Sequence, residues 1–425
     1  MRAAPKGFRL HIGLFGRRNA GKSSVLNALT GQEAAVVSEV AGTTTDPVEK
    51  PMELLPLGPV LFIDTAGVDD VGTLGAKRLA KTRQVFDRTD VGLIVAEAGQ
   101  WGDFEQGILH ALGERQVPVI AVLNKADLAA PPAEVVARLD AEGVPWVATV
   151  APEGHGMAEL RESLVRIVPE ERLRPPPIVS DLVPPGALCV LVVPIDLEAP
   201  KGRLILPQVQ TIRDLLDGDA QALVVKQRAL PAALARLARP PALVVTDSQA
   251  FLEVASATPP EVPMTSFSIL FARRMGDLTA FVEGAVAIDR LRPGDRVLVA
   301  EACTHHPIGD DIGRVKIPRW LRGHVGGELE FVTTAGRDFP ERLDEFRLVI
   351  HCGGCMGNRR EMLRRIVRCR DAGVPICNYG MTIAYTLGIF ERALGPFPDA
   401  LEAYRRHRLV GPRAAHPARS DGRGA

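Results

Sequence analysis

The stretch Gly16-Arg-Arg-Asn-Ala-Gly-Lys-Ser23 directly follows the apolar run His11–Phe15 and opens the helix-like run Ser23–Gly31. It fits the pattern G-x-x-x-x-G-K-[ST] in the strand–loop–helix context that separates a phosphate-binding loop from a chance match. Glycines let backbone amides approach a phosphate, and the helix N-terminus adds a positive partial charge. The stretch therefore predicts a P-loop nucleotide-binding domain with an α/β fold.

Two side chains of this loop have distinct expected roles. Lys22 is expected to reach the β- and γ-phosphates of a nucleotide, and the Ser23 hydroxyl to coordinate magnesium. The residues of the loop and first helical turn that we predict to contact the nucleotide are Gly16, Asn19, Ala20, Gly21, Lys22, Ser23 and Ser24.

Three further motifs follow in the order typical of GTPases. Asp64-Thr-Ala-Gly67 would supply a carboxylate behind magnesium and a glycine amide for the γ-phosphate, and Gly42-Thr-Thr-Thr-Asp46 a hydroxyl of a switch loop. Asn124-Lys-Ala-Asp127 would select guanine, because its aspartate accepts hydrogen bonds from guanine N1–H and N2–H that adenine lacks. The four motifs in order predict a GTPase. Its expected catalytic residues are Lys22, Thr44, Asp64 and Gly67, and its expected guanine contacts include Asn124, Lys125 and Asp127.

The organisation of the chain is that of three α/β segments. Over residues 8–170, strand-like and helix-like runs alternate, which is typical of a doubly wound, mostly parallel sheet. Proline-rich stretches then separate two smaller α/β segments. The expected division is a GTPase domain over 1–172, a linker over 173–178, a second domain over 179–264, a third over 265–410 and a disordered tail over 411–425.

The composition is that of a globular protein, with 46% hydrophobic and 24% charged residues. Lys+Arg and Asp+Glu both number 51, so bulk charge gives no reason to expect nucleic acid or a membrane as partner. No run approaches the roughly 20 apolar residues of a membrane helix, and the N-terminus lacks the apolar stretch of a secretory signal. We therefore expect a cytoplasmic protein, in which six cysteines favour metal binding or redox chemistry over disulfides.

Cysteine and histidine residues gather in the third segment. Cys352 and Cys355 form a C-x-x-C after one apolar run, and Cys303-Thr-His305 follows another. Because the carboxyl ends of strands in an open α/β sheet face one crevice, the two pieces could converge there. Three interpretations remain open: packed side chains without a ligand, a zinc site made by both pieces, or an iron–sulfur cluster held by three thiolates. His351 is either a labile ligand or a surface residue, and Cys189, Cys369 and Cys377 are expected to be packed in the core.

The GTPase segment resembles the TrmE/Era branch of GTPases through Asn19 in the P-loop, the GTT stretch at 42–44 and the hydrophobic Val68 after the aspartate motif. The resemblance implies that Asn19 binds a potassium ion that neutralises transition-state charge, and that Thr44 is the switch threonine and a magnesium ligand beside Ser23 and Asp64. The sequence departs from the branch at Thr45, where arginine is frequent. It also departs at Val150 and Ala151, the expected guanine-capping segment, where Ser-Ala is common.

Nearly the whole chain resembles the HydF family, the maturation GTPases of di-iron (FeFe) hydrogenase. The resemblance adds the runs PIDLEAPKGRLILPQVQTIRDLLD and TSFSILFARRMGDL and the pair CTHH and HCGGC to the GTPase motifs. It implies that 179–264 forms a homodimer and that 265–410 binds a 4Fe–4S cluster through Cys303, Cys352 and Cys355. His305 and His351 are then the candidate fourth ligands. Such proteins are scaffolds that receive a di-iron precursor from two radical-SAM partners and transfer it to the apo-hydrogenase.

Two other classes of function stay open at this stage. One is a tRNA- or ribosome-associated GTPase with a structural zinc module. The balanced charge and the lack of a basic face with interleaved aromatic residues argue against it. The other is a redox enzyme that uses the cluster for electron transfer, which needs a substrate pocket that the sequence does not indicate. We expect neither nucleic acid nor a membrane as partner.

Overall fold

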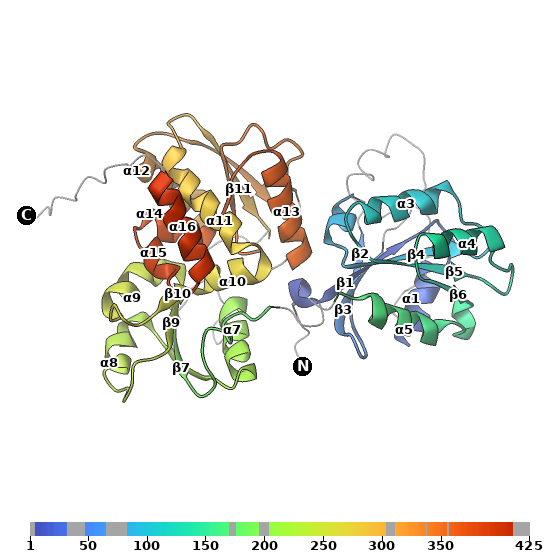
Figure 1. Cartoon of the computed structure of the whole chain (residues 1–425), viewed down its shortest axis with the longest axis horizontal. Helices are drawn as coiled ribbons and strands as arrows, with labels where there is room; N and C mark the ends of the chain where they lie inside the picture. The colour runs from blue at the N-terminus through green and yellow to red at the C-terminus, as the bar shows by residue number, and fades with distance from the viewer. Residues whose placement is uncertain are drawn as a thin grey trace, which may run out of the picture. The chain divides into compact units, whose positions relative to one another are not determined.

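The computed structural model describes residues 5–31, 47–64, 83–169, 176–194, 204–302, 311–336, 338–354 and 357–410. The chain divides into two compact units, each built from helices packed on β-sheet (Figure 1). The first unit comprises Met1–Pro175 with Met356–Glu361, and the second comprises Pro176–Cys355 with Met362–Ala425. Over the described residues, no helix is both long and apolar enough to cross a membrane.

The first unit contains a six-stranded sheet in the order β2-β3-β1-β4-β5-β6. Five of these strands pair in parallel, and β2 runs antiparallel to β3. The strands are β1 Leu10–Phe15, β2 Val48–Leu54, β3 Gly58–Asp64, β4 Val91–Glu97, β5 Val119–Asn124 and β6 Trp146–Thr149. The sheet confirms the predicted doubly wound, mostly parallel α/β fold.

Strand β2 departs from the sequence prediction, which places no strand there. Its sequence VEKPMEL carries three charged residues and a proline, and most of its side chains are partly or fully exposed. Such a segment lacks the apolar run that marks a central strand. It is tolerated at the sheet edge, because Pro51 has no N–H and an edge strand leaves one row of backbone groups unpaired.

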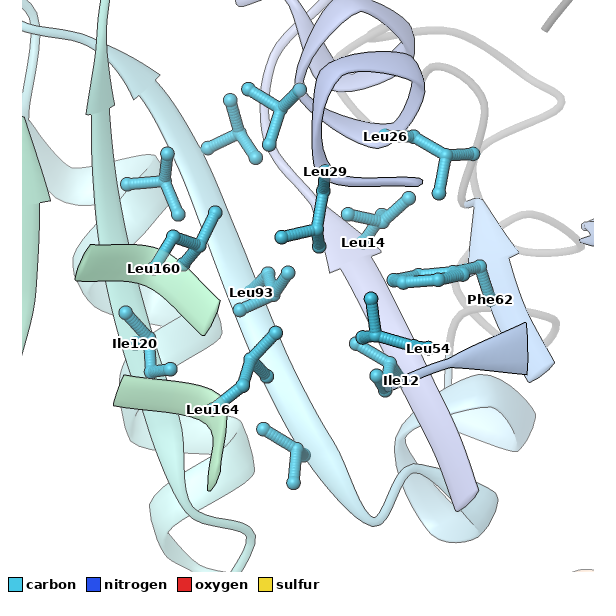
Figure 2. Packing of buried hydrophobic residues seen from close by; sticks show 14 of the residues in the cluster. Ile12, Leu14, Leu26, Leu29, Leu54, Phe62, Leu93, Ile120, Leu160 and Leu164 are labelled. Carbon is cyan, nitrogen blue, oxygen red and sulfur yellow. The ribbon is translucent and has the colours of Figure 1, made fainter. Parts of the chain in front are cut away.

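Helices cover both faces of this sheet. On one face lie α1 (Lys22–Thr30) and α5 (Met157–Ile167), and on the other α3 (Asp103–Gly113) and α4 (Ala133–Ala141). Figure 2 shows the first face, where Leu29 of α1 and Leu160 of α5 pack over Leu93 in the centre of the sheet. These three side chains are at most 1% exposed. Apolar residues on alternate positions of the strands therefore form two cores, and the loops at the strand ends are left for the site.

The second unit contains two four-stranded sheets, in the orders β10-β9-β7-β8 and β12-β11-β13-β14, and every pairing within them is parallel. The first sheet consists of β7 Leu188–Val192, β8 Gln221–Val225, β9 Leu243–Thr246 and β10 Met264–Ser266. The second consists of β11 Arg296–Glu301, β12 Glu330–Ala335, β13 Leu348–His351 and β14 Ile376–Asn378. The sequence predicts seven of these eight strands; β10 is the exception, because its three residues are too few to show a period.

The helices of the second unit connect and cover these strands. Their bounds are α7 Leu206–Asp217, α8 Leu230–Leu234, α9 Phe251–Ala257, α10 Phe267–Met275, α11 Leu278–Val286, α12 Ile317–Val325, α13 Arg359–Asp371, α14 Tyr379–Thr386, α15 Phe390–Ala393 and α16 Pro398–Val410. The predicted helix after the C-x-x-C is confirmed as α13. The predicted packing of three cysteines is also confirmed: Cys189, Cys369 and Cys377 are all fully buried.

Candidate nucleotide site and candidate metal centre

The nucleotide motifs that the structure describes in the first unit start where parallel strands end, whereas the switch-loop motif at 42–46 lies outside the described residues. The P-loop follows β1, Asp64 is the last residue of β3, Asn124 is the last residue of β5, and Val150 follows β6. Ligands of open α/β sheets bind outside the carboxyl ends of the strands. The topology therefore collects four separate motifs at one edge of the sheet.

Two positions of the P-loop require glycine because neighbouring atoms leave no room for a Cβ. Gly16 has φ of 144°, and a Cβ there would lie 2.0 Å from the Val95 carbonyl oxygen. Gly21 has φ of 94° and precedes α1, and a Cβ there would lie 2.2 Å from Asn124 Nδ2. Any larger residue at either position would push the loop away from the strands that support it.

Lys22 is held inside the curve of the P-loop by the loop's own backbone. Its Nζ donates to the carbonyl oxygens of Gly16 and Arg17, both at 2.8 Å, and the residue is 9% exposed. An ammonium fixed at the start of α1 lies beside the N-terminus of a helix, whose N–H groups favour binding of a phosphate chain. Ser23 and Ser24, the next two residues of α1, are half-buried.

Asn124 joins the P-loop to the segments that are expected to bind guanine. Its Nδ2 donates to the Ala20 carbonyl at 3.0 Å, and its Oδ1 accepts from Thr149 Oγ1 at 3.0 Å and from the Ala151 amide at 3.3 Å. The side chain is 1% exposed, so these bonds form without competition from water. The structure therefore brings Asn124, Ala151 and Ala20 together. The sequence motifs did not predict that Thr149 contacts Asn124. The feature that could have indicated it is the position of Thr149 as the last residue of β6.

Lys125 also has a partner that the sequence did not indicate. It adopts a positive φ of 58°, and its Nζ lies 2.5 Å from Glu97 Oε1 at the end of β4. Asp127, the expected guanine acceptor, is exposed two residues further on. Glu97 thus holds Lys125, the lysine of the guanine motif. The position of Glu97 at the end of a strand could have indicated this contact from the sequence.

Among the side chains predicted to bind magnesium, Asp64 is the one whose pKa is shifted from its usual value. Burial raises the pKa of its carboxyl, and the nearby Lys22 and Lys50 ammonium groups offset part of that effect. Its Oδ1 is buried and has no hydrogen-bond partner among the described residues. A carboxylate oxygen left unpaired at the end of β3 fits the magnesium that the motif predicts. Thr44 and Gly67 lie outside the described residues.

We expect Asp64→Asn to raise the stability of the nucleotide-free protein while it removes magnesium-dependent turnover. A carboxyl whose folded pKa is raised destabilises the fold above that pKa, and the neutral amide removes this cost. Thermal unfolding in EDTA should give a higher midpoint for the variant at neutral pH, and the gap should shrink as pH falls through the folded pKa of Asp64. A variant less stable than wild type at neutral pH would contradict this account.

In the second unit, the order of strands reverses between β11 and β13. The chain passes from β11 to β12 on one side and returns to β13 on the other. The point where strand order reverses is the usual place for ligands in such sheets. Glu301 ends β11 and His351 ends β13, so the sequences ACTHH and CGGC follow two adjacent strands.

Cys352 lies at this point. Its amide donates to the Ala300 carbonyl at 2.9 Å, and its Sγ accepts from the Ala302 amide at 3.0 Å. Backbone N–H groups directed at sulfur are a regular feature of thiolate metal sites. Gly354, with φ of 65°, keeps the turn after Cys352 tight.

His351 is buried, at 1% exposure, so the interpretation of His351 as a surface residue is wrong. Its Nδ1 lies 2.7 Å from the Cys352 carbonyl oxygen, and its Nε2 lies 2.8 Å from Arg365 Nη1. A carbonyl only accepts and a guanidinium only donates, so we infer a neutral ring with its proton on Nδ1. In this arrangement both ring nitrogens are engaged, and iron binding by His351 would require the bond to Arg365 to break.

Cys303, His305 and Cys355 lie outside the described residues. Within the described ranges, no three His, Cys, Asp or Glu side chains gather into a metal site. The contribution of these three residues therefore stays a prediction, and Cys352 is the predicted thiolate ligand whose surroundings the structure describes.

The sheet order, the P-loop and the guanine motif define the first unit as a P-loop GTPase domain. Residues 11–125 match the family profile described as 50S ribosome-binding GTPase. Residues 178–276 match the hydrogen maturase F dimerization domain, and residues 279–396 match the hydrogen maturase F tetramerization domain. The chain belongs to the hydrogen maturase F family.

Curated relatives match the GTPase part of the chain. The tRNA modification GTPase MnmE of Synechococcus sp. (strain JA-3-3Ab) is 39% identical over 168 residues, which covers 39% of this chain and 35% of that protein. GTPase Der of Wolinella succinogenes is 34% identical over 168 residues, which covers 37% and 36% respectively. The chain thus spans about a third of the length of the curated relatives it matches.

Solved structures also match the GTPase part. An Era variant of Aquifex aeolicus bound to GDP and AlF4⁻ is 27% identical, with a TM-score of 0.32, and covers 37% of this chain and 56% of that one. Era in complex with MgGDPNP and a segment of 16S ribosomal RNA is 26% identical, with a TM-score of 0.32 and the same two coverages. The fold assignment rests on the sheet order and motifs given above.

Proposed function

We propose that this chain is a hydrogenase-maturation GTPase that carries a 4Fe–4S cluster. It receives a di-iron precursor from radical-SAM maturases and transfers it to apo (FeFe)-hydrogenase. The observation that carries the proposal is the hydrogen bond from the Ala302 amide to Cys352 Sγ at the reversal point of the second sheet. Ala302 directly precedes Cys303 in the chain, and consecutive Cα atoms are about 3.8 Å apart.

The proposed cluster ligands are Cys303, Cys352 and Cys355. Thiolates suit iron–sulfur clusters and zinc alike, so the donor set fits the cluster without selecting it. Membership of the hydrogen maturase F family favours the cluster over zinc. When bound, such a cluster would offer one iron site for exchange with an incoming group. His305 remains a candidate fourth ligand, whereas His351 is the weaker candidate because Arg365 occupies its Nε2.

The proposed GTPase cycle uses GTP and magnesium at the ends of β1, β3, β5 and β6. Ser23, Thr44 and Asp64 would hold magnesium, and Gly67 would contact the γ-phosphate. The unpaired Asp64 Oδ1 supports the magnesium assignment. The dimerization and tetramerization profiles support self-association of the chain, as a dimer or a larger assembly.

Potassium is the proposed activating ion, with Asn19 as its ligand. Asn19 is exposed in the middle of the P-loop and adopts φ of 64°. We expect GTP turnover in KCl to exceed that in NaCl of equal ionic strength by about 10²-fold, the lower end of the range for one electrostatic stabiliser of developing charge. Asn19→Ala should remove the difference between the two salts. Equal rates of the wild-type protein in KCl and NaCl would contradict the potassium assignment.

A tRNA- or ribosome-associated GTPase with a zinc module is not favoured by these findings. The MnmE, Der and Era matches are confined to less than two fifths of the chain, whereas the remaining segments match hydrogen maturase F domains.

Anaerobic reconstitution of the full chain with iron and sulfide tests the proposal. We expect thiolate-to-iron absorption and a reduced-cluster EPR signal, with iron and sulfide near four of each per chain, as a 4Fe–4S cluster requires. A colourless protein that instead binds one zinc ion per chain would indicate a structural zinc site and contradict the proposed scaffold function.

A further inference from the structure

The P-loop is attached to helix α3 by an arginine–glutamate pair. Arg17 Nε lies 2.8 Å from Glu105 Oε1, and Arg17 Nη2 lies 3.2 Å from Glu105 Oε2. Both carboxylate oxygens are engaged by one guanidinium, which fixes orientation as well as distance. The two residues are 88 positions apart in the chain, so the pair ties the phosphate-binding loop to a separate element.

The carboxylate of this pair is inside the protein. The Glu105 side chain is 0% exposed, whereas that of Arg17 is 44% exposed. Glu105 Oε2 also accepts from the Gly102 amide at 3.0 Å, and the Arg17 guanidinium lies over the Phe104 ring at 5.2 Å. A buried carboxylate without a cation is strongly destabilising, so Glu105 holds Arg17 in one place.

The same residue contacts the lysine of the P-loop. The Arg17 carbonyl oxygen is one of the two acceptors of Lys22 Nζ, at 2.8 Å. The side chain of Arg17 is therefore fixed by Glu105 while its backbone fixes Lys22. A displacement of Arg17 would move one of the two groups that orient the Lys22 ammonium.

We propose that Arg17 and Glu105 are positioning residues for GTP hydrolysis. The pair holds the Arg17 carbonyl against Lys22, and so sets the direction of the ammonium toward the γ-phosphate. Neither side chain is assigned a direct contact with the nucleotide. The inference rests on the proposed GTPase activity. It adds Glu105 of α3 as a residue that holds the P-loop in place, which the P-loop sequence pattern does not include.

The protein offers a matched pair away from the site. Arg115 Nε lies 2.9 Å from Asp87 Oδ1, and the Arg115 guanidinium lies over the Phe86 ring at 5.6 Å. This pair is also an arginine–carboxylate contact with an aromatic ring under the guanidinium, but it is made through one carboxylate oxygen and lies beyond the C-terminal end of α3 rather than at the P-loop. Asp87→Asn is therefore the control for Glu105→Gln.

The test compares steady-state GTP turnover and thermal unfolding of the full-length chain for both variants. We expect Glu105→Gln to lower kcat/KM by about tenfold, the scale of one charge-assisted hydrogen bond. Most of the loss should be in kcat, because Lys22 acts most strongly on charge that develops during phosphoryl transfer. Asp87→Asn should keep GTP turnover within about twofold of wild type. It should lose less thermal stability than Glu105→Gln, because the Asp87 side chain is 31% exposed whereas that of Glu105 is 0% exposed.

Two further variants separate positioning from folding. Arg17→Lys keeps the charge but not the two-pronged contact, so its kcat should lie between those of wild type and Arg17→Met. The double variant Arg17→Met/Glu105→Gln should be no slower than the slower single variant, because both changes remove the same interaction.

Three results would overturn the inference: a kcat of Glu105→Gln within about twofold of wild type, a loss equal to that of Asp87→Asn, or additive losses in the double variant. Normal GTP turnover by Glu105→Gln would exclude the positioning role of the pair but leave the proposed GTPase activity intact. A wild-type chain that does not turn over GTP would remove the proposed activity and the positioning role with it.

Discussion

Lys22→Ala is expected to lower GTP turnover by about 10²–10³-fold, the range for removing one fixed donor at a site of developing charge. The lysine is the P-loop group that we expect to bring a full positive charge to the phosphates, and its Nζ is already oriented by the carbonyl oxygens of Gly16 and Arg17. No other described side chain donates to both of these carbonyls, so the loss has no local substitute. Steady-state phosphate release at saturating GTP and magnesium measures it.

The same variant should still assemble the proposed iron–sulfur cluster. Lys22 belongs to the first unit, whereas Cys352 and the strands that support it belong to the second. After anaerobic reconstitution, the Lys22→Ala protein should match wild type in iron, sulfide and EPR signal, but fail to activate apo-hydrogenase. Lys6→Ala is the control, because Lys6 is exposed and pairs with Glu49 away from the nucleotide site. Loss of the cluster in Lys22→Ala would show that nucleotide binding and cluster assembly are not separate functions.

The features that a sequence can predict are local. The P-loop, the aspartate motif and the guanine motif each depend on a few adjacent residues and on the strand before them, and seven strands of the second unit follow from short apolar runs. Periodicity and motif spacing report on such segments because the chain itself holds the residues together. Strand β2 was missed for the same reason, since an exposed edge strand with a proline has no local apolar signal.

The features that sequence missed are contacts between distant segments. Asn124 bonds to Ala20 across 104 positions, and Arg17 to Glu105 across 88. The pattern shows that Asn124 follows a strand, but the sheet order decides which loops stand beside it. His351 illustrates the same limit: its burial and its bond to Arg365 depend on α13, which begins after the C-x-x-C.

Cys352→Ala is expected to remove most of the reconstituted iron and sulfide while GTP turnover stays near that of wild type. A cluster with two of three thiolates left is held too weakly to survive gel filtration, because each thiolate supplies a metal bond that water replaces poorly. Cys352 is half-buried, so the truncation leaves no large cavity and the fold should persist. Iron and sulfide analysis, together with the EPR signal of the reduced protein, gives the measurement.

Cys369→Ala is the matched control for a lost thiol in the same sheet domain. Burial raises the pKa of Cys369 to about 12, so this thiol stays protonated and is a poor metal ligand. Its truncation should lower the thermal midpoint modestly but leave the cluster in place. If Cys352→Ala kept its full cluster, the sulfur beside the Ala302 amide would be a packed thiol, and the site at the reversal of the second sheet would need other ligands. If both variants lost the cluster equally, the loss would reflect damage to the domain rather than a missing iron bond.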